Sequence, residues 1–212
     1  MSRRALIQYL ELLKQSGITH LYRPQSDKAK LLSELQHKYS DCNKCLLAEG
    51  RIKFVYGEGN PDAKAMLIGE APGEQENQSG RPFVGAAGQL LDKMLDAIKI
   101  KRDDIYIANI VKCRPPGNRN PESEERLACM PYLIEQISIV EPKILLVMGL
   151  VAAQTLFTNS NTLSWHREAT LDFLGIPACV TYHPAALLRN PNWKKPAWDD
   201  LQQFQARYEE IT

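Results

Sequence analysis

Four short apolar runs separated by segments of helical periodicity constrain the fold of this chain most strongly. The runs cover residues 64–69, 104–111, 143–149 and 176–182. Apolar residues recur at helical spacing between them, over about 86–99 and 121–139, and a shorter helix is expected over 150–157. Strands that alternate with helices predict a parallel sheet covered on both faces. We therefore expect an α/β fold with three layers, α/β/α, around a central four-stranded, mainly parallel sheet.

Further helices are expected outside this alternating region. Residues 3–16 and 27–39 have apolar side chains at helical spacing, and so has the last segment, 194–210. With 212 residues, the chain is long enough for one good core plus an extension. We expect residues 1–40 to be an N-terminal helical extension packed on one α/β domain of residues 41–212.

Composition excludes few functions. The formal charge of +1 gives no overall attraction to a polyanion, so a nucleic-acid site must come from local clustering. No apolar stretch approaches the roughly 20 residues of a membrane span, and no signal-type apolar segment follows the first residues. We expect a cytoplasmic protein. The 5 cysteines are odd in number, which argues against a disulfide framework and favours metal ligation or buried thiols.

A long loop, residues 69–85, follows the first apolar run. Its glycines and prolines favour irregular backbone, and Glu70, Glu74 and Glu76 place carboxylates on it. Asn109 and His183 stand at or just beyond the ends of two other predicted strands. Parallel strands bring their carboxyl ends to one edge of a sheet, where α/β proteins bind ligands. The sequence thus predicts a single pocket that combines Glu70, Glu76, Asn109 and His183.

The cysteines form a second group. Cys42 and Cys45 are a CxxC pair, Cys113 follows the second predicted strand, and Cys129 lies on the helix after it. Four thiolates suit either a tetrahedral zinc ion or a cubane iron–sulfur cluster, and their spacing favours neither. Cys179 lies within a predicted strand, where a free cysteine is most often a small core residue.

Four motifs together resemble the family 4 uracil-DNA glycosylases, the iron–sulfur branch of that superfamily. They span residues 69–73, 80–85, 109–119 and 183–184, and the resemblance covers roughly residues 40–210. It implies a [4Fe-4S] cluster of structural role held by Cys42, Cys45, Cys113 and Cys129. The resemblance, rather than the cysteine spacing, favours iron over zinc.

The implied reaction is hydrolysis of the N-glycosidic bond of deoxyuridine in DNA. Such an enzyme must first flip the nucleotide out of the duplex. Phe83 offers a flat face to the uracil, and the Asn109 amide can pair with O4 and N3. His183 would donate to O2 as negative charge builds on the base. Glu70 and Glu76 could stabilise the sugar cation or position the water, and the sequence does not divide these roles.

Other positions in the same motifs are expected to touch substrate or DNA. Ala71 and Asn77 belong to the pocket loop, and Asn77 stands where relatives often carry an acid, whose loss could slow activation of the water. The segment after His183 resembles an intercalation loop, with Leu187, Leu188 or Arg189 as the wedge. Phosphates could be held by Arg119, together with Arg81, Arg114, Lys194 and Lys195.

Three other functions stay open from the sequence. One is a glycosylase that prefers another deaminated base, such as hypoxanthine or xanthine. Another is an iron–sulfur DNA-binding protein without catalysis. A nucleotide-binding loop is the weakest alternative, because residues 69–85 lack the Lys-Ser/Thr ending of a P-loop and carry repelling carboxylates. We expect a monomer that acts on uracil-containing DNA, single or double stranded, with no obligate protein partner.

Overall fold

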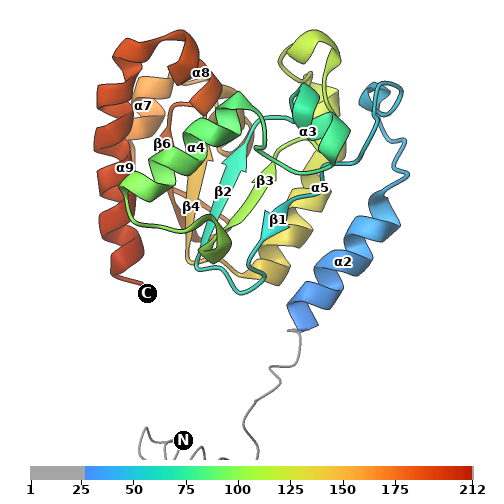
Figure 1. Cartoon of the computed structure of the whole chain (residues 1–212), viewed down its shortest axis with the longest axis horizontal. Helices are drawn as coiled ribbons and strands as arrows, with labels where there is room; N and C mark the ends of the chain where they lie inside the picture. The colour runs from blue at the N-terminus through green and yellow to red at the C-terminus, as the bar shows by residue number, and fades with distance from the viewer. Residues whose placement is uncertain (1–26, 212) are drawn as a thin grey trace, which may run out of the picture.

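The computed structural model describes residues 27–211, and within them it has the expected three-layer α/β/α architecture (Figure 1). The expected helix over residues 3–16 lies outside the described residues. The sheet has six strands in the order β1-β3-β2-β4-β6-β5. They are β1 (Glu58–Gly59), β2 (Ala65–Gly69), β3 (Tyr106–Asn109), β4 (Ile144–Met148), β5 (Leu171–Phe173) and β6 (Ile176–Thr181).

The four predicted strands form the parallel centre of this sheet. β3, β2, β4 and β6 pair in parallel, whereas β1 and β5 add antiparallel edges that the apolar pattern did not predict. All residues of β2, β3 and β4 are buried, as expected for strands covered on both faces. The prediction of four central parallel strands is therefore confirmed, but the sheet has two more short strands than expected.

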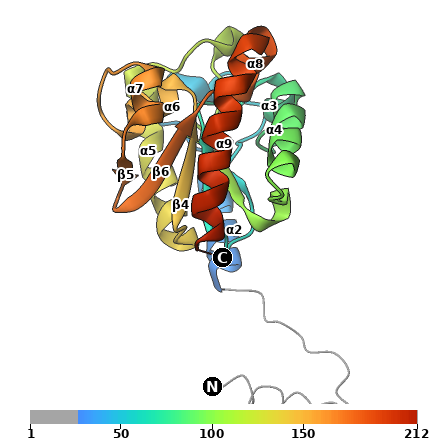
Figure 2. The same cartoon turned by 90° about the vertical axis from the view of Figure 1, so that its left-hand side faces the viewer.

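The helices that follow these strands cover both faces of the sheet (Figure 2). The described helices are α2 (Asp27–Tyr39), α3 (Glu74–Ser79), α4 (Ala86–Ala97), α5 (Ser123–Val140), α6 (Leu150–Leu156), α7 (Leu163–Glu168), α8 (Pro184–Arg189) and α9 (Lys194–Glu209). Short 3₁₀ turns are η1 (Leu46–Ala48), η2 (Arg102–Asp104), η3 (Pro116–Asn118) and η4 (Pro191–Trp193). Among the described helices, none is long and apolar enough to cross a membrane.

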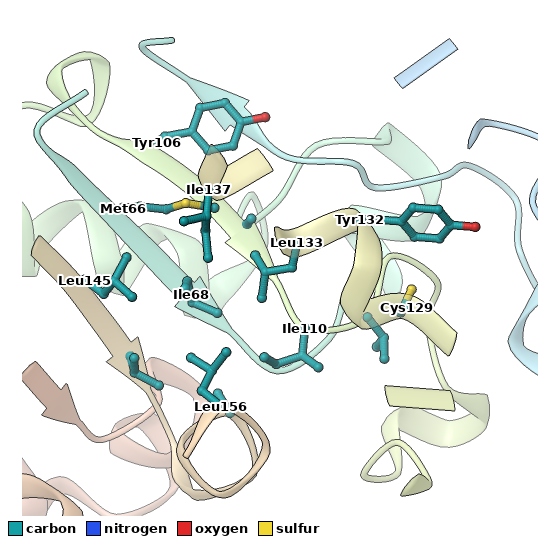
Figure 3. Close-up of a cluster of buried hydrophobic side chains, with 14 of the residues drawn as sticks. Met66, Ile68, Tyr106, Ile110, Cys129, Tyr132, Leu133, Ile137, Leu145 and Leu156 are labelled. Carbon is teal, nitrogen blue, oxygen red and sulfur yellow. The ribbon is translucent and has the colours of Figure 1, made fainter. Parts of the chain in front are cut away.

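Two buried clusters fill the space between the layers. One lies between the sheet and α5 and α6, where Met66 and Ile68 of β2 pack with Leu133, Ile137 and Leu156 (Figure 3). The other joins the opposite face of the sheet to α4 and α9, with Leu91, Leu95, Leu201 and Phe204 among its members. These clusters fix the strands, so the loops at their carboxyl ends stand on a rigid base.

Helix α2 lies beside α5 at one side of the domain (Figure 1). The Tyr39 hydroxyl donates to the Glu135 carboxylate at 2.8 Å, and Lys28 Nζ donates to Val140 O and to Glu141 at 3.1 and 2.7 Å. The part of the expected extension that is described is thus attached to the domain through α5.

Candidate active site

A cavity of about 740 Å³ opens at the carboxyl edge of the sheet. Its walls include Glu70 and Ala71 after β2, Asn109 at the end of β3, and His183 after β6. Phe83 closes one side of the cavity. These side chains come from separate strands and one loop, and the parallel topology brings them together as the sequence predicts.

Asn109 and Phe83 approach each other across Gly69. Gly69 pairs with Asn109 in the β2–β3 register. A Cβ at Gly69 would lie 2.4 Å from Asn109 Oδ1 and 2.6 Å from Phe83 Cζ, so only glycine leaves room for both side chains. Asn109 is 1% exposed, and its Oδ1 has no hydrogen-bond partner in the described part of the chain. A buried unpaired acceptor is costly, which makes it a natural contact for a ligand N–H.

Arg102 holds the backbone of the Phe83 turn. Phe83 adopts a left-handed backbone conformation, with φ of 51°. The Arg102 guanidinium donates to Phe83 O at 3.2 Å and to Pro82 O at 2.7 Å. It also pairs with Asp92 and Glu58, each at 2.9 Å. A strained conformation persists where its surroundings over-determine it, and Arg102 supplies that restraint here.

Lys112 supports Asn109 from beneath. Its side chain is fully buried, and Nζ donates to Asn109 O at 2.8 Å and to Gln136 Oε1 at 2.6 Å. Burial lowers the pKa of Lys112 to about 7. Sequence reasoning missed both Lys112 and Arg102, because hydrogen bonds to backbone carbonyls leave no motif in the sequence.

His183 enters the cavity as a neutral side chain. It is the N-cap of α8, and its Nδ1 accepts from the Ala185 amide at 3.2 Å. Burial and, to a smaller extent, the charge of Arg189 lower the pKa of His183 to about 4, although the charge of Glu76 acts in the opposite direction. With Nδ1 as acceptor in a neutral ring, the proton is on Nε2, which is then free to donate. The ring lies 5.5 Å from that of Phe83.

The two carboxylates expected in the site, Glu70 and Glu76, have different surroundings. No donor in the described residues contacts the Glu70 carboxylate, which lines the cavity. Burial raises the pKa of Glu70, and the charges of Arg126 and Arg189 oppose that rise. Glu76 also lines the cavity, but its Oε1 accepts from the Val84 and Gly85 amides at 2.8 Å each.

Glu76 therefore holds the loop together. Its Oε2 accepts from the Gly73 amide at 3.1 Å, which completes a capping box at the start of α3. Three backbone amides contact the carboxylate, which gives Glu76 a structural part in the loop, and its expected catalytic role stays a prediction. The helix α3 itself corrects the expectation of an irregular loop over residues 69–85.

Asn77 turns away from the cavity. It is buried, its Oδ1 accepts from the Ile52 amide at 3.0 Å, and its own carbonyl accepts from the Lys53 amide at 3.1 Å. Asn77 is not among the residues that line the cavity, and its expected substrate contact stays a prediction. Asn77 fastens the segment that follows the first two cysteines to α3.

Helix α8 presents two of the three expected wedge residues. Leu187 is 2% exposed and packs in the cluster beneath α4 and α9, so it cannot enter DNA without leaving the core. Leu188 is 47% exposed, and Arg189 is exposed at the rim of the cavity. The helical period explains the difference, because successive residues of an α-helix point about 100° apart around its axis, so one can face the core while the next faces solvent.

The expected phosphate-binding residues are mostly paired with carboxylates. Arg119 lines the cavity and forms a bidentate pair with Glu125, at 2.8 and 2.6 Å. Arg81 pairs with Glu58, and Arg114 pairs with Glu74. Lys194 and Lys195 are exposed at the start of α9. Among the described residues, Arg189 lines the cavity and Arg126 acts on Glu70 through its charge, and neither arginine forms an ion pair with a carboxylate.

The four cysteines Cys42, Cys45, Cys113 and Cys129 lie near one another. Cys129 faces the core from α5 (Figure 3), and the ionisation of Cys45, Cys113 and Cys129 responds to the charge of neighbouring thiols in the group. Burial raises the pKa of the Cys129 thiol to about 12. In the described residues, no three His, Cys, Asp or Glu side chains are placed to hold a single metal ion.

Several donors point at these sulfurs. Tyr132 Oη donates to Cys42 Sγ at 3.0 Å, the Lys112 amide to Cys129 Sγ at 3.3 Å, and Arg51 to Cys113 Sγ at 3.5 Å. Hydrogen bonds to cysteine sulfur are a feature of protein iron–sulfur sites, where they tune the cluster. A set of four thiols with such donors fits an iron–sulfur cluster chemically.

Comparison with known proteins agrees with this geometry. The family described as "Uracil DNA glycosylase superfamily" matches residues 56–202. The "Type-4 uracil-DNA glycosylase" of Pyrobaculum aerophilum is 41% identical over 82% of this chain and 92% of that protein. Proteins of the same name from Sulfurisphaera tokodaii and Thermotoga maritima are 41% and 40% identical, over 82% and 77% of this chain and 83% and 86% of their own.

Proposed function

The chain belongs to the type-4 branch of the uracil-DNA glycosylase superfamily, and from this premise we propose how its residues excise uracil. The enzyme is a DNA-repair hydrolase that breaks the bond between uracil and deoxyribose and leaves an abasic site. Since the bond is inaccessible within a base stack, the uracil nucleotide must be flipped into the cavity.

Asn109 and Phe83 select the base. Uracil presents N3–H to the unpaired Asn109 Oδ1 and accepts from the Asn109 amide at O4, while its ring stacks on Phe83. Cytosine would place an amine opposite the amide donor and an acceptor opposite Oδ1, which leaves buried groups unpaired. Ala71 lines the same cavity and adds a small apolar contact.

His183 and Glu70 act on the breaking bond. As the bond lengthens, negative charge grows on uracil, and Nε2–H of the neutral His183 donates to O2 without having to lose a proton. The sugar meanwhile becomes cationic. The unpaired Glu70 carboxylate stabilises that cation or orients the attacking water, as carboxylates do in glycoside hydrolysis. Glu76 keeps the loop in place during the reaction.

Helix α8 engages the DNA. Leu188, exposed next to the cavity, fills the space that the flipped nucleotide leaves in the stack, and Arg189 approaches the adjacent phosphates. Because its substrate is DNA, we propose that the enzyme acts in the cytoplasm. Wedge and basic residues together need no second subunit, so we propose a monomer as the active form.

Cys42, Cys45, Cys113 and Cys129 would hold a [4Fe-4S] cluster. When bound, the cluster contributes structural cross-linking rather than a step of the reaction. Its ligands lie before β1, after β3 and on α5, so it would join three segments that are distant in sequence. Cys113 lies only four residues beyond Asn109, and the cluster would therefore also restrain the end of β3.

The observation that carries this function is the buried Asn109 Oδ1, unpaired beside Phe83 and the neutral His183. The purified protein is incubated with a labelled oligonucleotide that holds one uracil, and alkali then cleaves any abasic site. We expect cleavage at the uracil by the parent protein, and a loss of about 10² or more in rate for His183→Ala. Glu210→Gln, at the exposed end of α9, serves as the control and keeps the parent rate. No alkali-labile site with the parent protein would refute the function.

A further inference from the structure

The cavity extends well beyond the pocket for one base. Its volume of about 740 Å³ equals that of roughly 25 water molecules in the liquid, far more than a single pyrimidine ring fills. The residues that line the cavity also include Tyr182, Arg189 and Trp193. The proposed catalytic residues do not include these three.

Tyr182 and Trp193 form an aromatic stack in the lining of the cavity. Their ring centroids are 5.3 Å apart, with an interplanar angle of 27°. The Arg167 guanidinium lies 4.8 Å from the centroid of the Tyr182 ring. Trp193 is nevertheless 41% exposed, so the indole keeps apolar surface that no residue of the described chain covers. Exposed indole beside a substrate cavity can accept another ring.

A buried ion pair fixes this stack in place. Arg167 Nε and Nη2 donate to the two carboxylate oxygens of Asp200 at 2.8 and 2.9 Å, and Nη2 also donates to Pro196 O at 3.0 Å. Thr181 Oγ1 donates to the same carboxylate at 2.8 Å. Thr181 immediately precedes Tyr182, so the stack is anchored to the end of β6. A preorganised ring loses little conformational freedom when a ligand stacks on it.

Charge around the stack suits a nucleic-acid strand. Arg189 also lines the cavity, and Lys194 and Lys195 follow Trp193 directly with exposed side chains. A groove that combines aromatic side chains with basic residues is the usual means of holding single-stranded DNA. Bases in a duplex are already stacked on their neighbours, whereas those of a single strand have a free face.

We propose that the Tyr182–Trp193 stack is a subsite for an unpaired base next to the flipped uracil nucleotide, and that it lets the enzyme bind uracil in single-stranded DNA. This proposal rests on the proposed function in one respect: the DNA strand that binds the subsite is the strand that contains the uracil. In this subsite Trp193 contacts the substrate, and Arg167 and Asp200 position the Tyr182–Trp193 stack.

Uracil excision under steady-state conditions tests the subsite on single-stranded and duplex oligonucleotides of the same sequence. Trp193→Ala should raise KM for the single strand about tenfold, with kcat and the duplex KM changed by less than about twofold. Trp193→Phe, which keeps a ring, should restore most of the affinity. Trp198→Ala is the matched control, because Trp198 is similarly exposed, at 39%, but does not line the cavity.

A change in the DNA provides the second arm. When the bases on both sides of the uracil in the single strand are replaced by abasic analogues, KM of the parent protein should rise by the same tenfold. KM of Trp193→Ala should not rise further. Equal effects of Trp193→Ala on duplex and single strand, or an undiminished effect on the abasic-flanked strand, would overturn the subsite. Binding of the same single strands, followed by fluorescence anisotropy, needs no chemistry and must show the same pattern. A parent protein that binds in this pattern but releases no uracil would refute the excision function while supporting the subsite.

Discussion

Replacing Gly69 by alanine should damage the uracil pocket without unfolding the protein. The new methyl group would lie 2.4 Å from Asn109 Oδ1 and 2.6 Å from Phe83 Cζ, both well inside van der Waals contact. The backbone at Gly69 is that of an ordinary β-strand, so alanine itself fits the main chain. The strain therefore falls on the two side chains that hold the base.

The cost can be worked from this geometry. Relief of both contacts requires each side chain to shift by up to about 1 Å, and a misplacement of that size in an active site costs on the order of 10² in rate. Overpacking of a filled site lowers the free energy of unfolding by about 1–3 kcal/mol. We expect kcat/KM for uracil excision to fall about 100-fold while the protein still unfolds cooperatively.

Single-turnover excision and thermal unfolding measure the two quantities separately. Gly50→Ala is the matched control, because a Cβ at Gly50 meets nothing within 4 Å, and it should leave both quantities unchanged. An active Gly69→Ala enzyme, with kcat/KM within about threefold of the parent, would show that Asn109 and Phe83 need not lie as close as they do here.

Three more predictions concern the carboxylates, the histidine and the cysteines. Glu70→Gln should lower kcat about 100-fold at unchanged melting temperature. Glu76→Gln places an amide against backbone N–H donors and should therefore lower the melting temperature as well; the opposite pattern in the two variants would mean that Glu76 takes part in the reaction directly. The pKa of His183 is lowered, so the folded protein binds fewer protons than the unfolded chain between pH 4 and 6.5; the contribution of His183 to stability is complete above about pH 6.5 and declines as pH falls towards 4. We expect kcat/KM to decline only near pH 4, and a rate profile with a midpoint near pH 6.5 would contradict a neutral His183. Cys113→Ser should abolish the visible iron–sulfur absorption and lower the melting temperature, whereas Cys179→Ser should keep the absorption, and equal loss in both would mean that the ligand set is wrong.

The strands at the centre of the sheet were predictable because their residues are apolar on both faces. β2, β3 and β4 read as continuous apolar runs, and the strand ends located Asn109 and His183. The edge strands β1 and β5 contain two and three residues and are only partly buried, so any alternation of apolar and polar residues in them is too short to identify a strand. The expected helix over residues 27–39 agrees with α2 in both bounds.

The roles of individual polar residues were less predictable. Glu76 and Asn77 are adjacent on a short helix. From the sequence we expected catalysis from Glu76 and substrate binding from Asn77, because a motif records residue types and not the directions of their side chains. Their hydrogen bonds run to Val84, Gly85 and Ile52, partners that only the folded loop brings near. Leu187 and Leu188 differ in burial for the same reason, since the pitch and seating of α8 decide which one faces the core.

The most direct test of the account is a panel of duplexes that each contain one altered base: uracil, hypoxanthine or xanthine. Alkali-labile cleavage by the parent protein is followed at equal enzyme and DNA concentrations. The Asn109–Phe83 pocket predicts a rate for uracil at least 100-fold above that for either purine. Hypoxanthine and xanthine offer Asn109 the same N–H and carbonyl pair, but their second ring places the glycosidic bond farther from that pair and therefore out of register with His183 and Glu70. A faster release of hypoxanthine or xanthine would contradict the assignment of the pocket to uracil.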